Sequence, residues 1–184
     1  MWRPLVVDSL FTRDDRRAVL DTCDYLYKFR SSYDAGFGRV TSGDNRLLPY
    51  LYASTYAAQK VFGVDSLLPT YALWARYDVP QSNLHKHKDD NACTYTLDYC
   101  VRQREPWDIY VEGTPYTLQE DQALAFLGED QEHWRPDFPK RNVVEMIFFH
   151  FVTPDHWFFN SKAERPERFA NFISEPLPDV ALPQ

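Results

Sequence analysis

From Leu68 onwards the sequence is a succession of short apolar or alternating runs, and this feature constrains the fold more than any other. Pro, Gly, Asn and Asp, which favour turns, separate the runs. The runs are TYALWARYDV, ACTYTLDYCV, DIYV, ALAFLG and NVVEMIFFHFV. Several short strands with turn signals between them predict a β-sandwich or a β-barrel.

The region before these runs has a helical pattern. Thr12 followed by Asp15 has the spacing of a helix N-cap with an acidic residue in the first turn. Apolar residues then recur at helical spacing and predict an amphipathic helix over 13–29. A second helix is predicted over 47–63, where Gly63 supplies a C-cap. The sequence therefore predicts a mostly β fold with N-terminal helices, of the α+β class.

The chain has 184 residues, of which 44% are hydrophobic, and this is ample for one packed core. We expect a single domain with a helical N-terminal support over 1–66, a β core over 67–153 and a C-terminal extension over 154–184. The turn-rich segment 31–46 is predicted to be a loop. The proline-bearing end, 174–184, is predicted to be extended and peripheral.

Charge and cysteine content exclude several classes of function. The formal net charge of −7 argues against a phosphate-binding track, so we expect no nucleic-acid partner. Three cysteines at unrelated spacings predict reduced thiols in a cytoplasmic protein. The longest apolar run, VVEMIFFHFV, is about half of a bilayer span, so we expect no membrane partner.

The stretch LHKHKDD contains several potential metal ligands. If it ends a strand, His85, His87 and Asp89 point to the same side, because side chains two residues apart share a face. A further ligand must then come from a distant segment, for which His133 is the natural candidate. Two imidazoles and one carboxylate on one octahedral face are typical of non-haem Fe(II) oxygenases. The same histidines also fit a charged, solvated turn, and His150 fits a core histidine.

Two longer segments resemble the 2-oxoglutarate/Fe(II) oxygenase superfamily, in its prolyl-hydroxylase-like branch with small bacterial and phage members. RYDVPQSNLHKHKDDNACTYTLDY contains a tyrosine, then L-x-x-H-x-D, then a strand. PWDIYVEGTPYTLQEDQALAFLGEDQEHWRPDF resembles the region that leads to an H-W-R ligand motif, and FFHFV resembles the closing strand. The resemblance covers about residues 66–153. Leu84, three residues before His87, selects His87 and Asp89 as the ligand pair.

Two positions depart from the pattern of the superfamily. The turn before the aliphatic strand, residues 120–122, lacks the usual glycine. Asp90 stands where the small relatives often have arginine.

The resemblance implies a double-stranded β-helix, which is a cupin-like jelly roll, with Fe(II) held at its open end by His87, Asp89 and His133. It also implies that 2-oxoglutarate chelates the iron as a cosubstrate and that O2 is the oxidant.

An arginine then pairs with the C5 carboxylate of 2-oxoglutarate in a bidentate fork. Arg141 is favoured narrowly for this role over Arg135, which lies two residues after His133. Tyr77, ten residues before His87, matches a position that contacts 2-oxoglutarate in related hydroxylases.

The function implied is a 2-oxoglutarate-dependent dioxygenase that hydroxylates a C–H bond. The presence of Asp89 favours hydroxylation over halogenation, because halogenating relatives have a small residue there. A short chain has little material for a peptide clamp, so we expect a small-molecule substrate, such as an amino acid or a natural-product intermediate.

Three alternatives stay open at this point. One is a peptidyl or prolyl hydroxylase that acts on a protein. Another is a cupin-like metal-binding protein without 2-oxoglutarate, which would use His85, His87 and either Asp90 or His133. The last is a β-sandwich interaction module in which the histidines are incidental.

Overall fold

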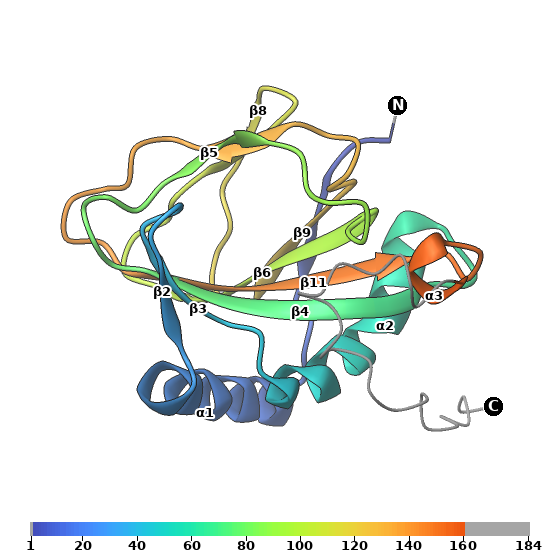
Figure 1. Cartoon of the computed structure of the whole chain (residues 1–184), viewed down its shortest axis with the longest axis horizontal. Helices are drawn as coiled ribbons and strands as arrows, with labels where there is room; N and C mark the ends of the chain where they lie inside the picture. The colour runs from blue at the N-terminus through green and yellow to red at the C-terminus, as the bar shows by residue number, and fades with distance from the viewer. Residues whose placement is uncertain (1, 161–184) are drawn as a thin grey trace.

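Two antiparallel β-sheets and two main helices make up the computed structural model, which describes residues 2–160 (Figure 1). The elements in chain order are β1 (Leu5–Asp8), α1 (Arg13–Phe29), β2 (Ser32–Asp34), β3 (Arg39–Ser42), a 3-10 turn (Asn45–Leu47), α2 (Leu48–Phe62), β4 (Leu68–Tyr77), β5 (Leu84–His87), β6 (Tyr95–Gln103), β7 (Ile109–Val111), β8 (Thr114–Tyr116), β9 (Gln122–Phe126), β10 (His133–Arg135), β11 (Val144–Val152) and α3 (Trp157–Asn160).

The large sheet has the strand order β1-β9-β6-β11-β4-β3-β2, and the small sheet has the order β5-β10-β7-β8. Figure 1 shows α1 on one side of the large sheet, with β5 and β8 of the small sheet on the other side. Each face of the large sheet is therefore covered, by helices on one side and by the small sheet on the other. Among the described residues, no helix combines the length and the apolarity needed to cross a bilayer.

Two large hydrophobic cores follow from this layering. Side chains alternate along β11, so that Met146 and Phe148 enter the core between the sheets, whereas Ile147 and Phe149 enter the core beneath the helices. All nine residues of β11 are buried. A strand covered on both faces needs apolar residues at nearly every position, which explains the uninterrupted apolar run in the sequence.

The predicted helices are confirmed. Helix α1 spans Arg13–Phe29, and the Thr12 hydroxyl caps it by accepting a hydrogen bond from the Asp15 amide at 3.2 Å. Helix α2 ends at Phe62, followed by Gly63 in the left-handed conformation with a φ of 67°. The mostly β fold class with N-terminal helices is likewise confirmed.

The loop prediction for residues 31–46 is wrong. Strands β2 and β3 form a hairpin there, and β3 pairs with β4 at the edge of the large sheet. The first 66 residues therefore contribute strands as well as helices, because β1 also joins the large sheet by pairing with β9. The short segments that join the sheet here, β1, β2 and β3, have little apolar alternation of their own, whereas their partners β4 and β9 have clear apolar runs. The prediction for 174–184 lies outside the described residues.

One carboxylate is buried on the helix side of the large sheet. The Glu145 side chain, on β11, is fully buried. Its Oε1 lies 2.5 Å from Nη1 of Arg76 on β4 and 3.0 Å from Nε of Arg102 on β6. The sheet register creates this arrangement, since Glu145 pairs with Arg76 on one side and Arg102 on the other. Removing the acid would leave two partly buried arginines without the carboxylate that they share, although Arg76 would still pair with Asp78 and Arg102 with Asp24.

We predict that Glu145→Ala lowers the free energy of unfolding by about 2–3 kcal/mol, a little less than for a fully buried pair because both arginines retain solvent contact. Urea denaturation measures this change. The control is Glu132→Ala, which removes an exposed pairing with Lys86 at 3.5 Å and should cost less than about 0.5 kcal/mol. Equal losses from the two variants would contradict the role assigned to Glu145.

Candidate metal centre

The pairing of β5 with β10 brings two histidines together. In this antiparallel ladder His133 is the direct partner of His87. Their ring centroids lie 4.3 Å apart. Segments separated by more than forty residues in the sequence therefore place two imidazoles at one point of the small sheet.

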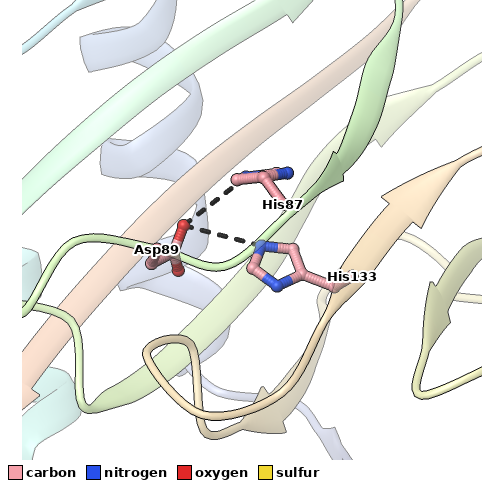
Figure 2. A group of neighbouring side chains, drawn as sticks. All are labelled: His87, Asp89 and His133. Atoms are coloured by element: carbon pink, nitrogen blue, oxygen red, sulfur yellow. Dashed lines mark ion pairs between the residues drawn. The ribbon is translucent and has the colours of Figure 1, made fainter.

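Asp89 completes a group of three at this point. It follows β5 directly, and its amide donates a hydrogen bond of 2.9 Å to the carbonyl of Gly128. Its Oδ1 lies 3.6 Å from Nε2 of His87 and 3.5 Å from Nε2 of His133. Figure 2 shows the three side chains facing one another. Their potential ligand atoms all lie within 4.8 Å of one another, a spacing that suits one cation.

A backbone carbonyl contacts Nδ1 of each imidazole and favours the same tautomer in both. Nδ1 of His87 lies 2.7 Å from the carbonyl oxygen of His85, and Nδ1 of His133 lies 2.9 Å from that of Gln131. Because a carbonyl oxygen only accepts, each Nδ1 carries the hydrogen, and Nε2, which faces the Asp89 carboxylate, is the nitrogen of each ring that can coordinate a metal ion. In both cases the acceptor lies two residues earlier in the chain.

Asp89 and the histidines shift one another's protonation. Burial disfavours the charged form of Asp89, but contacts with His133 and His87 and nearby positive charge outweigh it, so the pKa of Asp89 lies below its ordinary value. Burial would lower the pKa of His133, yet Asp89 raises it overall. The carboxylate is therefore ionised at neutral pH, as a metal ligand must be.

The three residues open onto a cavity of about 270 Å³ between the sheets. Its lining combines an apolar wall with charged groups. The lining residues are Phe37, Arg39, Tyr71, Leu73, Leu84, His87, Lys88, Asp89, Asp90, Asp98, His133, Phe148 and His150. Asp98 is buried there, and burial raises its pKa to about 7, although Arg135 and His133 act in the opposite direction.

This donor set fits a ferrous ion. Two imidazole nitrogens and one carboxylate could occupy one face of an octahedral ion, and all three residues line the cavity, where further ligands could bind. Such a facial arrangement with open positions is the one that non-haem iron chemistry uses. The ring of His85, in contrast, stacks on Phe37 with centroids 4.8 Å apart, and His85 belongs to no potential ligand group among the described residues.

A second potential ligand group shares Asp89 with the first and adds Cys93 and His150. Nδ1 of His150 lies 3.1 Å from the Thr96 hydroxyl, and burial lowers the pKa of His150 to about 4. Cys93 lies 3.0 Å from the hydroxyl of Tyr71. His150 is thus buried and hydrogen-bonded, but it also lines the cavity rather than lying wholly in the core.

The residues expected to contact 2-oxoglutarate do not line the cavity. Arg141 is exposed in a left-handed turn before β11, with a φ of 61°. Arg135 is buried, and its guanidinium donates to the Trp107 carbonyl and lies 3.9 Å from the Met146 sulfur. Tyr77 is buried, and its hydroxyl accepts a hydrogen bond of 2.8 Å from Arg39.

Arg39 is the buried cation among the lining residues that the sequence did not point to. It lies in the segment predicted to be a loop, and no motif marked it. Only the pairing of β3 with β4 brings it to the cavity.

Known structures share this fold at low sequence identity. No family model and no curated protein matches the sequence. The α-ketoglutarate-dependent epimerase SnoN from nogalamycin biosynthesis has a TM-score of 0.67 at 8% identity, over 89% of this chain and 86% of that chain. A Pseudomonas putida prolyl-4-hydroxylase has a TM-score of 0.60 at 14% identity, over 82% and 92% of the two chains.

HygX from Streptomyces hygroscopicus, solved with nickel and 2-oxoglutarate bound, has a TM-score of 0.61 at 11% identity, over 83% of each chain. The chain therefore has the double-stranded β-helix fold of the 2-oxoglutarate/Fe(II) oxygenases, and the fold implied by the sequence resemblance is confirmed.

We predict that His87→Ala and His133→Ala each weaken the binding of Fe(II) by more than about 100-fold. Loss of a residue that only hydrogen-bonds a metal ligand lowers metal affinity by about 10–100-fold, so loss of a ligand itself should lower it further. Anaerobic isothermal titration calorimetry measures the affinity. The matched control is His85→Ala, two residues away on the same strand, which should retain the affinity of the wild type. Equal losses from His85→Ala and His87→Ala would favour a cupin-like ligand set.

Gly128 gives an independent test of the position of Asp89. A Cβ atom at Gly128 would lie 2.4 Å from Oδ2 of Asp89 and 2.6 Å from the Thr96 hydroxyl. We therefore predict that Gly128→Ala displaces the carboxylate and weakens Fe(II) binding by roughly 10–100-fold, as for other changes around a ligand. Calorimetry measures the affinity and urea denaturation checks the fold; a folded variant with unchanged affinity would exclude Asp89 as a ligand in this position.

Proposed function

We propose that the chain is an Fe(II)- and 2-oxoglutarate-dependent dioxygenase that hydroxylates a C–H bond of a small molecule. The observation that carries the proposal is the group formed by His87, Asp89 and His133 at the wall of a cavity between the sheets. The fold shared with SnoN, prolyl hydroxylases and HygX supports it.

The roles of the residues follow from their contacts. His87 and His133 would hold the metal through Nε2, and the carbonyls bonded to their Nδ1 atoms fix the rings so that neither nitrogen rotates away. Asp89 would supply the anionic ligand. With Fe(II), 2-oxoglutarate and O2 bound, the cofactor set would supply an oxidant for a C–H bond, and 2-oxoglutarate would be converted to succinate and CO2.

The cavity wall would govern access to the metal. Leu73, Leu84 and Phe148 form an apolar part of this wall, which limits the water around the reacting groups. Phe37 extends the wall from the β2–β3 hairpin. These side chains would orient a substrate by shape, because they offer no hydrogen-bonding group.

A compact substrate suits the size of this cavity. Ligand sites usually measure about 300–1,000 Å³, and this cavity, at about 270 Å³, must also hold the cosubstrate. HygX has been solved with hygromycin B bound, whereas a prolyl hydroxylase from Trichoplax adhaerens has been solved with a peptide fragment. We favour an amino acid or a natural-product intermediate over a protein, and the acidic balance of the chain disfavours nucleic acid.

Substrate-stimulated turnover of 2-oxoglutarate tests the proposal. Iron-loaded protein is mixed with amino acids, natural-product intermediates or proline-containing peptides, and the formation of succinate is measured. We predict stimulation by a small molecule, a loss of more than about 100-fold in His87→Ala and retention of most activity in His85→Ala.

Stimulation by the peptides alone would favour a peptidyl hydroxylase. Fe(II) binding without any succinate formation, with or without candidate substrates, would favour a cupin-like metal protein. Absence of Fe(II) binding would favour an interaction module.

A further inference from the structure

The buried cation of the cavity comes from the β2–β3 hairpin. Among the described residues that line the cavity, the arginine and lysine side chains are those of Arg39 and Lys88. Lys88 is exposed, whereas Arg39 is only 8% exposed. A buried, oriented cation binds an anionic ligand more strongly than a solvated one, because water screens it less.

Neighbouring side chains hold the Arg39 guanidinium in place. Its Nε lies 3.1 Å from Oδ2 of Asp34, and its Nη1 donates a hydrogen bond of 2.8 Å to the Tyr77 hydroxyl. Its Cζ lies 4.3 Å from the centre of the Phe37 ring. Within residues 2–160, no hydrogen-bond acceptor for its Nη2 is found. The group is thus positioned with part of its donor capacity unused.

The backbone beside Arg39 is fixed to the segment that leads to His87. The amide of Asn83 donates to the Phe37 carbonyl at 3.1 Å, and the Ser82 hydroxyl donates to the Gly38 carbonyl at 2.7 Å. Gly38 has a φ of 57°, and a Cβ atom there would lie 2.4 Å from the Gln81 carbonyl oxygen. This close contact couples the position of Arg39 to that of the candidate metal centre.

We propose that Arg39 binds the C5 carboxylate of 2-oxoglutarate, the carboxylate that does not chelate the metal. This inference rests on the proposed function and assigns one of its ligand contacts. The cavity also contains Asp90 and Asp98, so a dianionic cosubstrate needs a cation there. Arg39 lies outside the segment 66–153 that resembles the oxygenases, and it takes the role that sequence reasoning gave to Arg141 or Arg135.

Tyr77 contacts Arg39 but does not itself line the cavity. Because Arg39 donates to the Tyr77 hydroxyl, Tyr77 is a positioning residue for the guanidinium. Contacts with Tyr77 and Asp34 outweigh the effect of burial and raise the pKa of Arg39, so the cation persists at any physiological pH.

The test compares two 2-oxo acids that differ in the C5 carboxylate. Anaerobic Fe(II)-loaded protein is titrated with 2-oxoglutarate or with 2-oxobutanoate, which lacks this group, and equilibrium binding is measured by calorimetry. We predict that Arg39→Gln lowers the affinity for 2-oxoglutarate by roughly 10–100-fold, the range expected for a lost charge-assisted pair, and that Arg39→Lys restores part of it. The affinities for 2-oxobutanoate and for Fe(II) should change by less than about twofold.

Arg141→Gln is the matched control and should bind 2-oxoglutarate as the wild type does. If Arg39→Gln lowered the affinity for both 2-oxo acids equally, or left the affinity for 2-oxoglutarate unchanged, the assignment would be overturned. The assignment would also be overturned if Arg135→Gln or Lys88→Gln, and not Arg39→Gln, selectively lowered the affinity for 2-oxoglutarate. Failure of the wild-type protein to bind either 2-oxo acid would instead refute the proposed function.

Discussion

The antiparallel pairing of β5 with β10 is the interaction on which the candidate site depends. It sets His133 opposite His87, and the bond from the Asp89 amide to the Gly128 carbonyl brings the carboxylate to the same point. A shift of one residue in this ladder would turn one imidazole to the opposite face of the small sheet. Strand register therefore determines whether the potential ligands can meet, and their side chains need only adopt suitable rotamers.

The rest of the fold supports this short ladder. The large sheet is buried on both faces, and its central strand β11 packs into both hydrophobic cores. The two carboxylates lie on opposite sides of the large sheet. Glu145 pairs with Arg76 on the side of the helices, and Asp89 contacts His133 on the side of the small sheet. A rigid base of this kind is what a metal centre requires, because coordination tolerates only small displacements of its ligands.

Local patterns made much of this structure predictable. Thr12 and Gly63 signal helix ends through contacts within a few residues, and the long strands carry their own apolar runs. The choice of His87 and Asp89 over His85 rested instead on the resemblance to the oxygenase superfamily, because the residues alone left all three as potential ligands. The hairpin that carries Arg39 was not predictable, because its pairing with β4 depends on a partner more than thirty residues away. The same applies to the carbonyls that orient His87 and His133, since only the three-dimensional structure shows their direction.

The three-residue metal centre is tested most directly by a crystal structure of the protein soaked anaerobically with Mn(II), in which anomalous scattering locates the ion. We predict a single ion bonded to Nε2 of His87, Nε2 of His133 and a carboxylate oxygen of Asp89. An ion bound instead by Asp89, Cys93 and His150, or no ion at either group at saturating Mn(II), would contradict it.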